Sequence, residues 1–307
     1  MKFCSFSANE SLRFGIELDP AHLCDVREAG IELLGAGSLK GSNKELFESR
    51  SLKEWLTFGE GALETSARIK ERVWQGEGLE SKGVYSRQQS RMLAPIQDPS
   101  KIIAVGLNYL DHAEEQKVQA PERPLIFAKF PSSIVGPDEP IKIPSISKQV
   151  DPEAELCIVM LKRGRGFTTE SAKLAAGFMV GNDVSARDLQ YSDKQWVRGK
   201  SCDSFAPCGP FVVTGADIGD PNALDIQLKV NDRVQQASNT KNLIFDSYQL
   251  IQFISETITL EPGDIIFTGT PSGVGVFRDP QVFLKPGDVL EVTIQNLGTL
   301  RNPVVAG

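Results

Sequence analysis

Three carboxylates stand at the ends of two neighbouring apolar runs. Glu153 and Glu155 lead the run AELCIVML, and Asp183 ends the run GFMVGND. If Glu153 begins a strand, the period of two places Glu153 and Glu155 on one face of it. Like charges that lie close together repel, so a carboxylate pair leading an apolar strand calls for a counter-charge. Three carboxylates without clustered Cys or His are typical of a hard-cation site, suited to Mg²⁺ or Mn²⁺, with Ca²⁺ as a substitute.

The alternative interpretation of the two glutamates is a solvated strand edge. Glu-x-Glu at the start of a strand is more often exposed to water than bound to a metal, and the spacing alone favours that alternative. Asp183 supports the metal interpretation only if a neighbouring strand brings its carboxylate to the same point. Water and substrate oxygens would then complete the coordination of the ion.

A histidine and a glutamate share one face of a short predicted helix. In GLNYLDHAEEQ, which follows the apolar run KIIAV, His112 and Glu115 are three residues apart. The carboxylate can fix the imidazole tautomer and raise its basicity, and such a pair can deprotonate a water molecule or a carbon acid. The alternative is a surface pair on a solvated helix, which is the commoner case for such spacing alone.

The chain contains two histidines, so a histidine-based mechanism in this part of the chain must use His112. The other histidine, His22, has Asp25 three residues further on and could mimic a dyad. No carboxylate cluster or glycine turn accompanies it, and we therefore interpret His22 as a surface or helix-start histidine.

Two further polar segments carry groups suited to a bound anion. Lys200 follows a glycine in a predicted loop rich in Ser, Cys and Pro, a good place for a cation beside an anion. Upstream, Gln190 is a neutral donor for a substrate oxygen, while Arg187 and Asp188 are interpreted as an internal ion pair. The loop GTPSG contributes the Thr270 hydroxyl and backbone amides that could bind a carboxylate. Its SGVG lacks the third glycine and the following helix of a dinucleotide site, which excludes that alternative.

These side chains must be positioned by a strand-rich scaffold. From Lys101 onward, short apolar runs are punctuated by Pro and Gly, and ten of them are predicted strands: KIIAVGL, PLIFAKF, SSIVG, EPIKIP, AELCIVML, GFMVGND, GPFVVTG, DIQLKVN, DIIFTG and VLEVTIQNLG. This pattern is typical of an α+β, β-rich domain rather than of regular β-α-β alternation. Helices are predicted at NYLDHAEEQ, TTESAKLAA and FDSYQLIQFISET.

Residues 1–95 are predicted to form a small α/β N-terminal domain. The segments KFCSF and LRFGIEL suggest a hairpin, and HLCDVREAGIELL and SLKEWLTF have helical patterns. The segment MLAPIQDPSK contains two prolines and marks the predicted boundary. The metal-binding catalytic domain is expected over residues 100–305.

Composition and charge are compatible with a small-molecule enzyme, and the cysteines indicate a reducing compartment. The net charge of −7 and the pI near 5.1 argue against a nucleic-acid surface, which needs clustered Lys and Arg. The five cysteines form no CxxC pair, which argues against a zinc ribbon or a disulfide scaffold. No apolar run approaches the roughly 18 residues of a membrane span, and no targeting segment is recognised. The expectation is a cytoplasmic protein that binds neither nucleic acid nor membrane, with an organellar location left open.

Taken in order, these segments resemble the fumarylacetoacetate hydrolase family, and most closely its domain-containing protein 2 branch. The resemblance spans residues from about 101 to 304 and rests on ordered motifs: GLNYLDHAEEQ, PLIFAKFPSSIVGP, the E-A-E of Glu153 and Glu155, NDVSARDLQ, KQWVRGKSCDSFAPCGP, GDIIFTGTPSGVGVFRDP and FLKPGDVLEV. It implies the family's mixed β-roll catalytic domain, usually homodimeric, preceded by a smaller N-terminal domain.

The resemblance also implies roles for individual residues. The metal ligands would be Glu153, Glu155 and Asp183, the water-activating dyad His112 with Glu115, the oxyanion-stabilising cation Lys200, and the substrate contacts Gln190, Tyr109 and Thr270. One position departs from the family, because Leu107 stands where hydrolase members often carry a basic residue before Asn-Tyr.

The resemblance implies a Mg²⁺- or Mn²⁺-dependent enzyme acting on a small 2-oxo dicarboxylate or acylpyruvate, with oxaloacetate as the first compound to test. A metal chelated by carboxylate and keto oxygens stabilises an enolate. The main expectation is carbon-carbon cleavage, by hydrolysis or decarboxylation. The alternatives are an oxaloacetate keto-enol tautomerase and, from another class, a catalytically inactive binding protein that has kept the shape.

Overall fold

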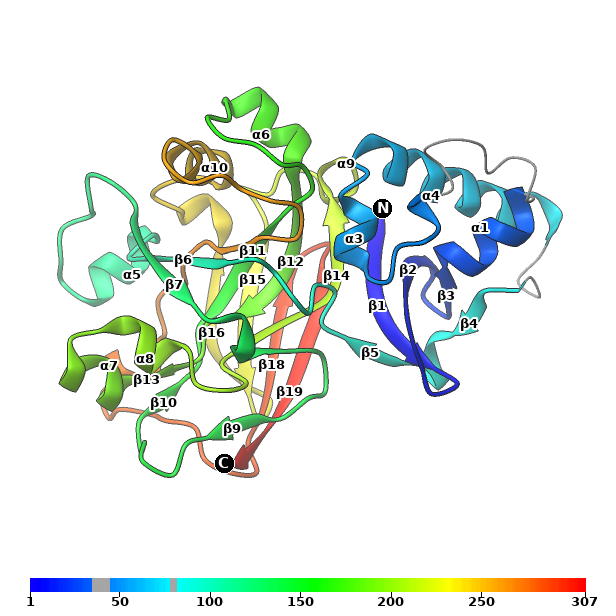
Figure 1. Cartoon of the computed structure of the whole chain (residues 1–307). Coiled ribbons are helices and arrows are strands. Elements are labelled where there is room, and N and C mark those ends of the chain that lie inside the picture. Colours follow the sequence, from blue (N-terminus) through cyan, green and yellow to red (C-terminus); the bar gives the residue numbers. More distant parts are fainter. Residues whose placement is uncertain (35–44, 78–81) are drawn as a thin grey trace.

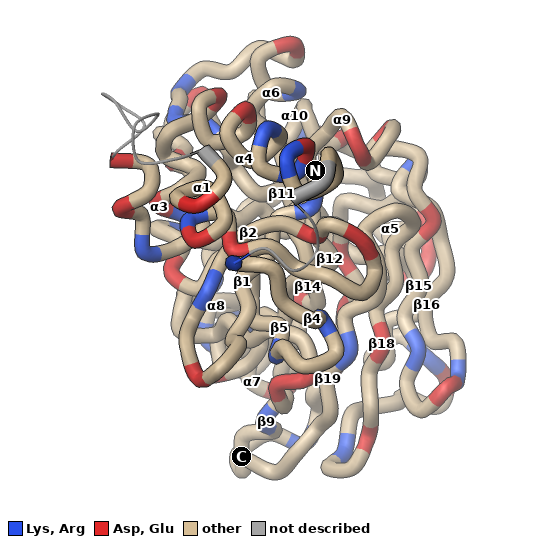
Figure 2. The backbone as a smooth tube through the Cα atoms, turned by 90° about the vertical axis from the view of Figure 1, so that its right-hand side faces the viewer, with Lys and Arg blue, Asp and Glu red and all other residues tan. Residues whose placement is uncertain are grey.

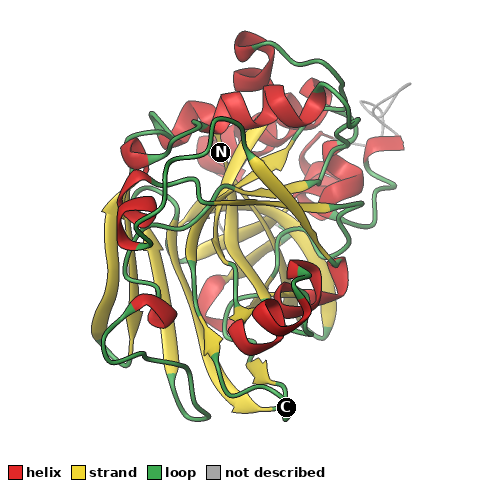
Figure 3. Ribbon diagram, turned by 90° about the vertical axis from the view of Figure 1, so that its left-hand side faces the viewer, coloured by secondary structure: helices red, strands yellow, loops and turns green. Residues whose placement is uncertain are grey.

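The computed structural model describes residues 1–34, 45–77 and 82–307 (Figure 1). Within these residues the strands form a 12-stranded sheet, a 5-stranded sheet and a 2-stranded ribbon. Helices lie around the strands rather than regularly between them (Figure 3). Basic and acidic residues are interspersed along the backbone (Figure 2). The expectation of a β-rich α+β chain is confirmed.

The N-terminal segment begins with the predicted hairpin. Its strands are β1 (Lys2–Ala8), β2 (Ser11–Asp19), β3 (His22–Asp25), β4 (Val84–Ser86) and β5 (Arg91–Leu93). Its helical elements are α1 (Val26–Leu34), α3 (Leu52–Leu56), α4 (Glu60–Arg72), the π-helical turn η2 (Val73–Glu77) and the 3-10 turn η3 (Arg87–Gln89). Strand β1 pairs antiparallel with β14 of the following part, so both parts share one sheet. The domain boundary near residues 95–100 stays a prediction.

The central part of the large sheet is built from the predicted apolar runs. Its strands are β6 (Ile102–Gly106), β7 (Leu125–Lys129), β8 (Ile134–Val135), β11 (Ala154–Met160), β12 (Ala176–Asn182), β14 (Ala206–Thr214) and β17 (Ile265–Phe267). Strand β11 lies between β12 and β17, and all seven of its residues are buried. Burial on both faces explains why this segment is an almost unbroken apolar run.

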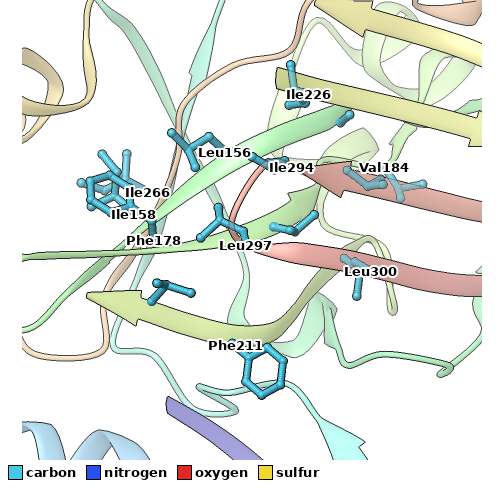
Figure 4. Close-up of a cluster of buried hydrophobic side chains, with 14 of the residues drawn as sticks. Leu156, Ile158, Phe178, Val184, Phe211, Ile226, Ile266, Ile294, Leu297 and Leu300 are labelled. Atoms are coloured by element: carbon cyan, nitrogen blue, oxygen red, sulfur yellow. The ribbon is translucent and has the colours of Figure 1, made fainter. Parts of the chain in front are cut away.

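The five-stranded sheet packs against the large sheet. It consists of β16 (Arg233–Asn239), β15 (Asp225–Val230), β18 (Val289–Ile294), β19 (Gly298–Ala306) and β9 (Ile141–Ile143). One hydrophobic cluster joins side chains from both sheets, among them Leu156, Phe178, Ile226 and Ile294 (Figure 4). The short ribbon of β10 (Val150–Asp151) and β13 (Ser185–Ala186) lies beside this core.

The three helices predicted in the second part are present as α5 (Leu110–Glu115), α6 (Thr169–Ala175) and α10 (Ser247–Ser255). Helix α10 is capped by Asp246, whose carboxylate accepts from the backbone amides of two residues in the first turn. The remaining helices and turns are α7 (Arg187–Asp193), α8 (Trp196–Lys200), α9 (Gly215–Ile218), η4 (Pro131–Ser133), η5 (Thr240–Asn242) and η6 (Gly275–Phe277). The segment around Lys200, predicted as a loop, is therefore helical up to Lys200 itself.

Candidate active site

The three predicted carboxylates converge at one point. Glu153 lies one residue before β11, Glu155 lies within β11, and Asp183 follows β12. The antiparallel register pairs Ala154 with Asn182, so the end of β12 lies against the start of β11. One oxygen of each carboxylate lies within 4.8 Å of the others, and all three residues are buried. The solvated-edge alternative is wrong, because Glu155 is 1% exposed.

Two buried lysines contact two of these carboxylates. The Lys200 ammonium lies 2.5 Å from Glu153 Oε2 and 2.8 Å from Asp183 Oδ2. The Lys129 ammonium lies 2.5 Å from Asp183 Oδ1. Burial raises the pKa of Glu153, but the charges of Lys200 and Arg187 outweigh it, and the pKa lies below its ordinary value. Glu153 is therefore ionised and ready to act as a ligand.

Arg187 connects Glu153 to two further groups. Its guanidinium donates to Glu153 Oε1 at 2.5 Å, to Asp151 Oδ2 at 3.0 Å and to Gln190 Oε1 at 3.0 Å. The Asp151 carboxylate also accepts the backbone amides of Gly275 and Val276 in η6. Through Asp151, one buried arginine thus connects a candidate metal ligand to the turn η6.

Glu155 differs from the other two carboxylates. It accepts a hydrogen bond from the Gly269 amide at 2.7 Å, and no ion pair to it is present within the described residues. Burial, followed by the charges of Asp183 and Glu153, raises its pKa well above the ordinary value. A buried carboxylate facing two others calls for one more positive charge. Oxygen donors alone, at this mutual distance, fit a hard divalent cation such as Mg²⁺ or Mn²⁺.

The predicted dyad is formed on α5. Nδ1 of His112 lies 2.9 Å from Glu115 Oε2, and the other Glu115 oxygen accepts the Gly273 amide at 2.8 Å. The amide of Gln116 lies 2.7 Å from His112 Nε2. Because an amide N–H donates, Nε2 carries the lone pair and Nδ1 carries the proton donated to Glu115. The Phe277 ring packs edge-on against the imidazole, with centroids 5.6 Å apart.

Buried hydrogen bonds fix the position of α5. The side-chain amide of Asn108, just before the helix, donates to the carbonyl oxygens of Thr268 and Phe245. The Asp111 carboxylate accepts from the Ser238 hydroxyl at 2.6 Å. The dyad is therefore anchored to both the large and the five-stranded sheets.

The three carboxylates and His112 line one cavity of about 110 Å³, well below the roughly 300–1,000 Å³ typical of sites for drug-sized ligands. Gln190, Lys200 and Thr270 also line it. Its lining residues are Val105, Gly106, Leu107, His112, Gln116, Phe127, Glu153, Glu155, Asp183, Arg187, Gln190, Tyr191, Trp196, Lys200, Thr270 and Phe277. The size suits a small organic acid.

Part of the cavity lining is apolar. Leu107, Phe127, Trp196 and Phe277 are among the lining residues, and Leu107 adopts a left-handed backbone with φ 54°. A low-dielectric lining strengthens the electrostatic effect of the charged groups in the same cavity. Leu107, where a basic residue stands in many hydrolases that the sequence resembles, thus adds apolar surface to the cavity.

Tyr109 is a buried residue that does not line the cavity. Its side chain is fully buried and is not among the lining residues, and its hydroxyl has no hydrogen-bond partner within the described residues. Burial, followed by the charges of Glu155 and Asp111, raises its pKa. The role of Tyr109 as a substrate contact stays a prediction.

One pairing expected from the sequence is wrong. Arg187 does not pair with Asp188, whose carboxylate instead accepts from the Ser147 hydroxyl and the Lys148 amide. The sequence neighbour was chosen there over partners that only the fold brings close. His22, interpreted from the sequence as a surface or helix-start histidine, begins strand β3 and contacts Asp19.

Sequence reasoning also missed Lys129, Asp151 and Gln116. Lys129 had a usable signal, because a lysine inside the apolar run PLIFAKF is out of place unless it has a buried partner. Asp151 had no usable signal in the sequence beyond its closeness to Glu153. Gln116 also had a usable signal, because it lies four residues beyond His112, the spacing that places two side chains on one face of a helix.

Residues 101–305 match the family described as "Fumarylacetoacetate (FAA) hydrolase C-terminal". The chain belongs to the fumarylacetoacetate hydrolase family. It is 46% identical over 257 residues to "Oxaloacetate tautomerase fahd2, mitochondrial" of Xenopus laevis, covering 83% of this chain and 78% of the relative. It is 46% identical over 225 residues to the Homo sapiens "Oxaloacetate tautomerase FAHD2A, mitochondrial", covering 72% of each chain. The predicted family and its domain-containing protein 2 branch are confirmed.

Solved structures of the fumarylacetoacetate hydrolase family share the fold over the whole chain. The fumarylacetoacetate hydrolase of Exiguobacterium antarcticum is 34% identical with a TM-score of 0.79, covering 100% of both chains. A maleylpyruvate hydrolase of Sphingobium sp. SYK-6, solved with manganese(II) and pyruvate, is 28% identical with a TM-score of 0.76, again covering 100% of both chains. The fold class predicted from the sequence is confirmed.

Proposed function

We propose that this protein is a divalent-metal-dependent tautomerase that interconverts the keto and enol forms of oxaloacetate or of a closely related small 2-oxo dicarboxylate. The observation that carries the proposal is the buried triad of Glu153, Glu155 and Asp183 in the same cavity as His112, whose Nδ1 contacts Glu115. The names of the relatives favour tautomerisation over the carbon-carbon cleavage that the sequence led us to expect first.

The triad would hold Mg²⁺ or Mn²⁺, with Ca²⁺ as a substitute. Glu155 is the residue that most needs the ion, because the neighbouring cations contact Glu153 and Asp183 instead. A divalent ion bound there would supply a Lewis acid for the carboxylate and keto oxygens of a 2-oxo acid. Manganese(II) in the Sphingobium maleylpyruvate hydrolase supports an ion of this class.

Tautomerisation moves one proton between C3 and the oxygen on C2, so the protein must supply a base and stabilise negative charge. His112 is the base in this proposal, since Nε2 carries the lone pair while Glu115 holds the proton on Nδ1. Nε2 is covered by the Gln116 amide, and that amide must move aside before the imidazole can accept the C3 proton. The Glu115 carboxylate then stabilises the imidazolium that forms.

Three side chains would contact the substrate oxygens. The Lys200 ammonium would stabilise negative charge on the C2 oxygen. Gln190 and Thr270, which line the cavity, would donate hydrogen bonds to carboxylate oxygens. The apolar residues of the lining would exclude water and so slow competing hydrolysis.

Hydrolysis at the same centre remains the second candidate. The names of two solved relatives, a fumarylacetoacetate hydrolase and a maleylpyruvate hydrolase, support it. In that reaction His112 would deprotonate water instead of a carbon acid. Decarboxylation of oxaloacetate would need the same metal and the same cavity.

The predicted homodimer and the absence of nucleic-acid or membrane partners are part of the proposal. Within the described residues, no helix is long and apolar enough to cross a membrane. Relatives named as mitochondrial support an organellar location over the cytoplasm expected from the sequence. Fluorescence microscopy of the tagged protein in its own cells tests the location, and light scattering tests the dimer.

The direct test follows the ultraviolet absorbance of enol-oxaloacetate after it is added to purified protein with Mg²⁺ or Mn²⁺. Tautomerase activity predicts metal-dependent decay to the keto form without pyruvate, and Glu155→Ala should remove the metal response. Pyruvate formed at the rate of enol loss would instead assign cleavage. No acceleration with either metal would contradict the proposed function.

A further inference from the structure

A glutamine outside the cavity forms hydrogen bonds both to strand β11, which carries the candidate metal ligand Glu155, and to a threonine that lines the cavity. Gln236, on β16 of the five-stranded sheet, is 1% exposed and is not among the cavity-lining residues. Its side-chain oxygen accepts the backbone amide of Ala154, which lies between Glu153 and Glu155. Its side-chain nitrogen donates to the Thr270 hydroxyl and to the Pro271 carbonyl, each at 2.8 Å.

A β-bulge sets the direction of this side chain. Gln236 pairs with Leu228 and Val234 pairs with Lys229, so Gln235 is the extra residue of β16. A bulge inserts one unpaired residue and re-aims the side chains beside it. Gln236 therefore points to the active-site side, while Gln235 lines a separate cavity with Arg278 and Lys285.

The hydrogen bond from the Ala154 backbone amide allows the side-chain amide of Gln236 only one orientation. An N–H can donate only to the side-chain oxygen, and a flipped amide would set two donors against each other. The nitrogen must therefore face Thr270. Both of its protons are used, one on Thr270 and one on Pro271.

The Thr270 hydroxyl oxygen is consequently an acceptor for Gln236, and its own proton remains available. No hydrogen bond donated by this hydroxyl is present within the described residues, and Thr270 lines the cavity. We propose that Gln236 is a positioning residue, which fixes the Thr270 hydroxyl as a donor into the cavity and so strengthens binding of a substrate oxyanion. This inference deepens the proposed function and rests on it for the identity of the substrate.

The experiment measures binding of 3,3-dimethyl-2-oxosuccinate, which has no hydrogen on C3 and cannot enolise. Titration calorimetry at saturating Mg²⁺ compares the wild type with Gln236→Met, Thr270→Val and the double variant. A hydrogen bond to a charged group predicts a loss of about 10- to 100-fold in affinity for Gln236→Met and for Thr270→Val. The double variant should bind about as weakly as Thr270→Val, because Gln236 acts through that hydroxyl.

Three controls separate positioning from a structural role. Thr270→Ser keeps the hydroxyl and should retain affinity, and Gln235→Met changes the neighbouring glutamine and should bind like the wild type. Mn²⁺ affinity, measured without the analogue, should change far less than analogue affinity in Gln236→Met. If Mn²⁺ affinity fell as much as analogue affinity, the role of Gln236 would be to hold β11 and its metal ligands in place, and the proposal would be overturned.

Losses that multiply in the double variant, or wild-type affinity in a folded Gln236→Met protein, would also overturn it. If Gln236→Met does not fold, Gln236→Asn keeps an amide but shortens its reach, and should show the same loss. If neither variant folds, Gln236 has a structural role only, and the proposal is overturned. Because the analogue cannot tautomerise, its binding is scored independently of tautomerase turnover, and a carbon dioxide assay of the same mixtures checks that it is not decarboxylated during the titration. An absence of tautomerase activity would therefore refute the proposed function without deciding this inference.

Discussion

The two histidines of this protein form nearly the same local pair in different surroundings. His22 Nδ1 lies 3.0 Å from the Asp19 carboxylate, and His112 Nδ1 lies 2.9 Å from the Glu115 carboxylate, each pair being three residues apart. The His22 side chain is 30% exposed on β3, whereas that of His112 is 7% exposed in the cavity. A histidine–carboxylate distance therefore does not distinguish a catalytic pair from a surface pair.

The surroundings make the distinction. His112 shares its cavity with three buried carboxylates and Lys200, and both of its ring nitrogens have partners. His22 is not among the residues that line this cavity. Only the buried pair has both a place for a substrate and a place for a metal beside it.

The strongest test of this contrast replaces each histidine in turn. His112→Ala should lower kcat for oxaloacetate tautomerisation by about 10²- to 10⁴-fold, the contribution of a positioned general base. His22→Ala should leave kcat at the wild-type value. The enol absorbance assay measures both, with Mg²⁺ affinity as a check that the ligand set survives. Equal effects of the two substitutions would remove the distinction.

The second test changes the carboxylate partners while keeping their shape. Glu115→Gln should lower kcat by about 10- to 100-fold, because the amide no longer stabilises the imidazolium or fixes its tautomer. Asp19→Asn is the matched control and should not change activity. Steady-state kinetics at fixed Mg²⁺ gives both values. A fully active Glu115→Gln enzyme would mean that His112 works without its partner.

A smaller effect is expected from the residue that covers the imidazole. Gln116→Ala removes the amide from His112 Nε2, so substrate no longer has to displace that hydrogen bond. We expect kcat to rise by about 2- to 10-fold, the usual net value of one such bond. A decrease in kcat would instead show that Gln116 holds the ring in its working orientation. Pyruvate analysis of the same reactions detects any gain of hydrolysis or decarboxylation.

The smallest expected effect is a pH dependence of folding stability that comes from Glu155. The surroundings of His22 are not expected to contribute such a dependence. The raised pKa of Glu155 means that folding favours its protonated form. This contribution to stability is complete below the ordinary pKa of a glutamate and is lost as pH rises through the raised value. Metal-free protein should therefore lose thermal stability with rising pH above the ordinary carboxyl range. Mn²⁺ at 100 times its Kd should raise the free energy of unfolding by about 2.7 kcal/mol. This gain is measured as an increase in Tm of a few degrees.

The Glu155→Gln variant is the control for that pH dependence. It carries no titrating group at this position, so its metal-free stability should be flatter over the same range. A wild-type curve as flat as that of the variant would contradict the assignment of the pH effect to Glu155.

Patterns within single segments predicted much of the fold. All ten apolar runs after Lys101 contain strands, and the three helical patterns contain helices. Burial of β11 on both faces and the spacing of Glu153 and Glu155 follow from residue types at fixed period. Helices α7 and α8 were missed, because their polar sequences have no apolar periodicity over so few residues.

Partners that are distant in sequence could not be found in this way. Lys129 meets Asp183 across 54 positions, and Gln236 meets Ala154 across 82. The pairing of β1 with β14 is equally invisible, since a strand pattern does not identify its neighbour. The triad itself was found because two of its members share a strand and the third ends the adjacent one.

The most direct measurement is anomalous diffraction at the manganese edge from crystals grown with Mn²⁺. We predict one ion in the cavity beside His112, bonded to one oxygen each of Glu153, Glu155 and Asp183. A saturating concentration of Mn²⁺ that produced no peak among these carboxylates, or a peak only elsewhere in the molecule, would contradict the account.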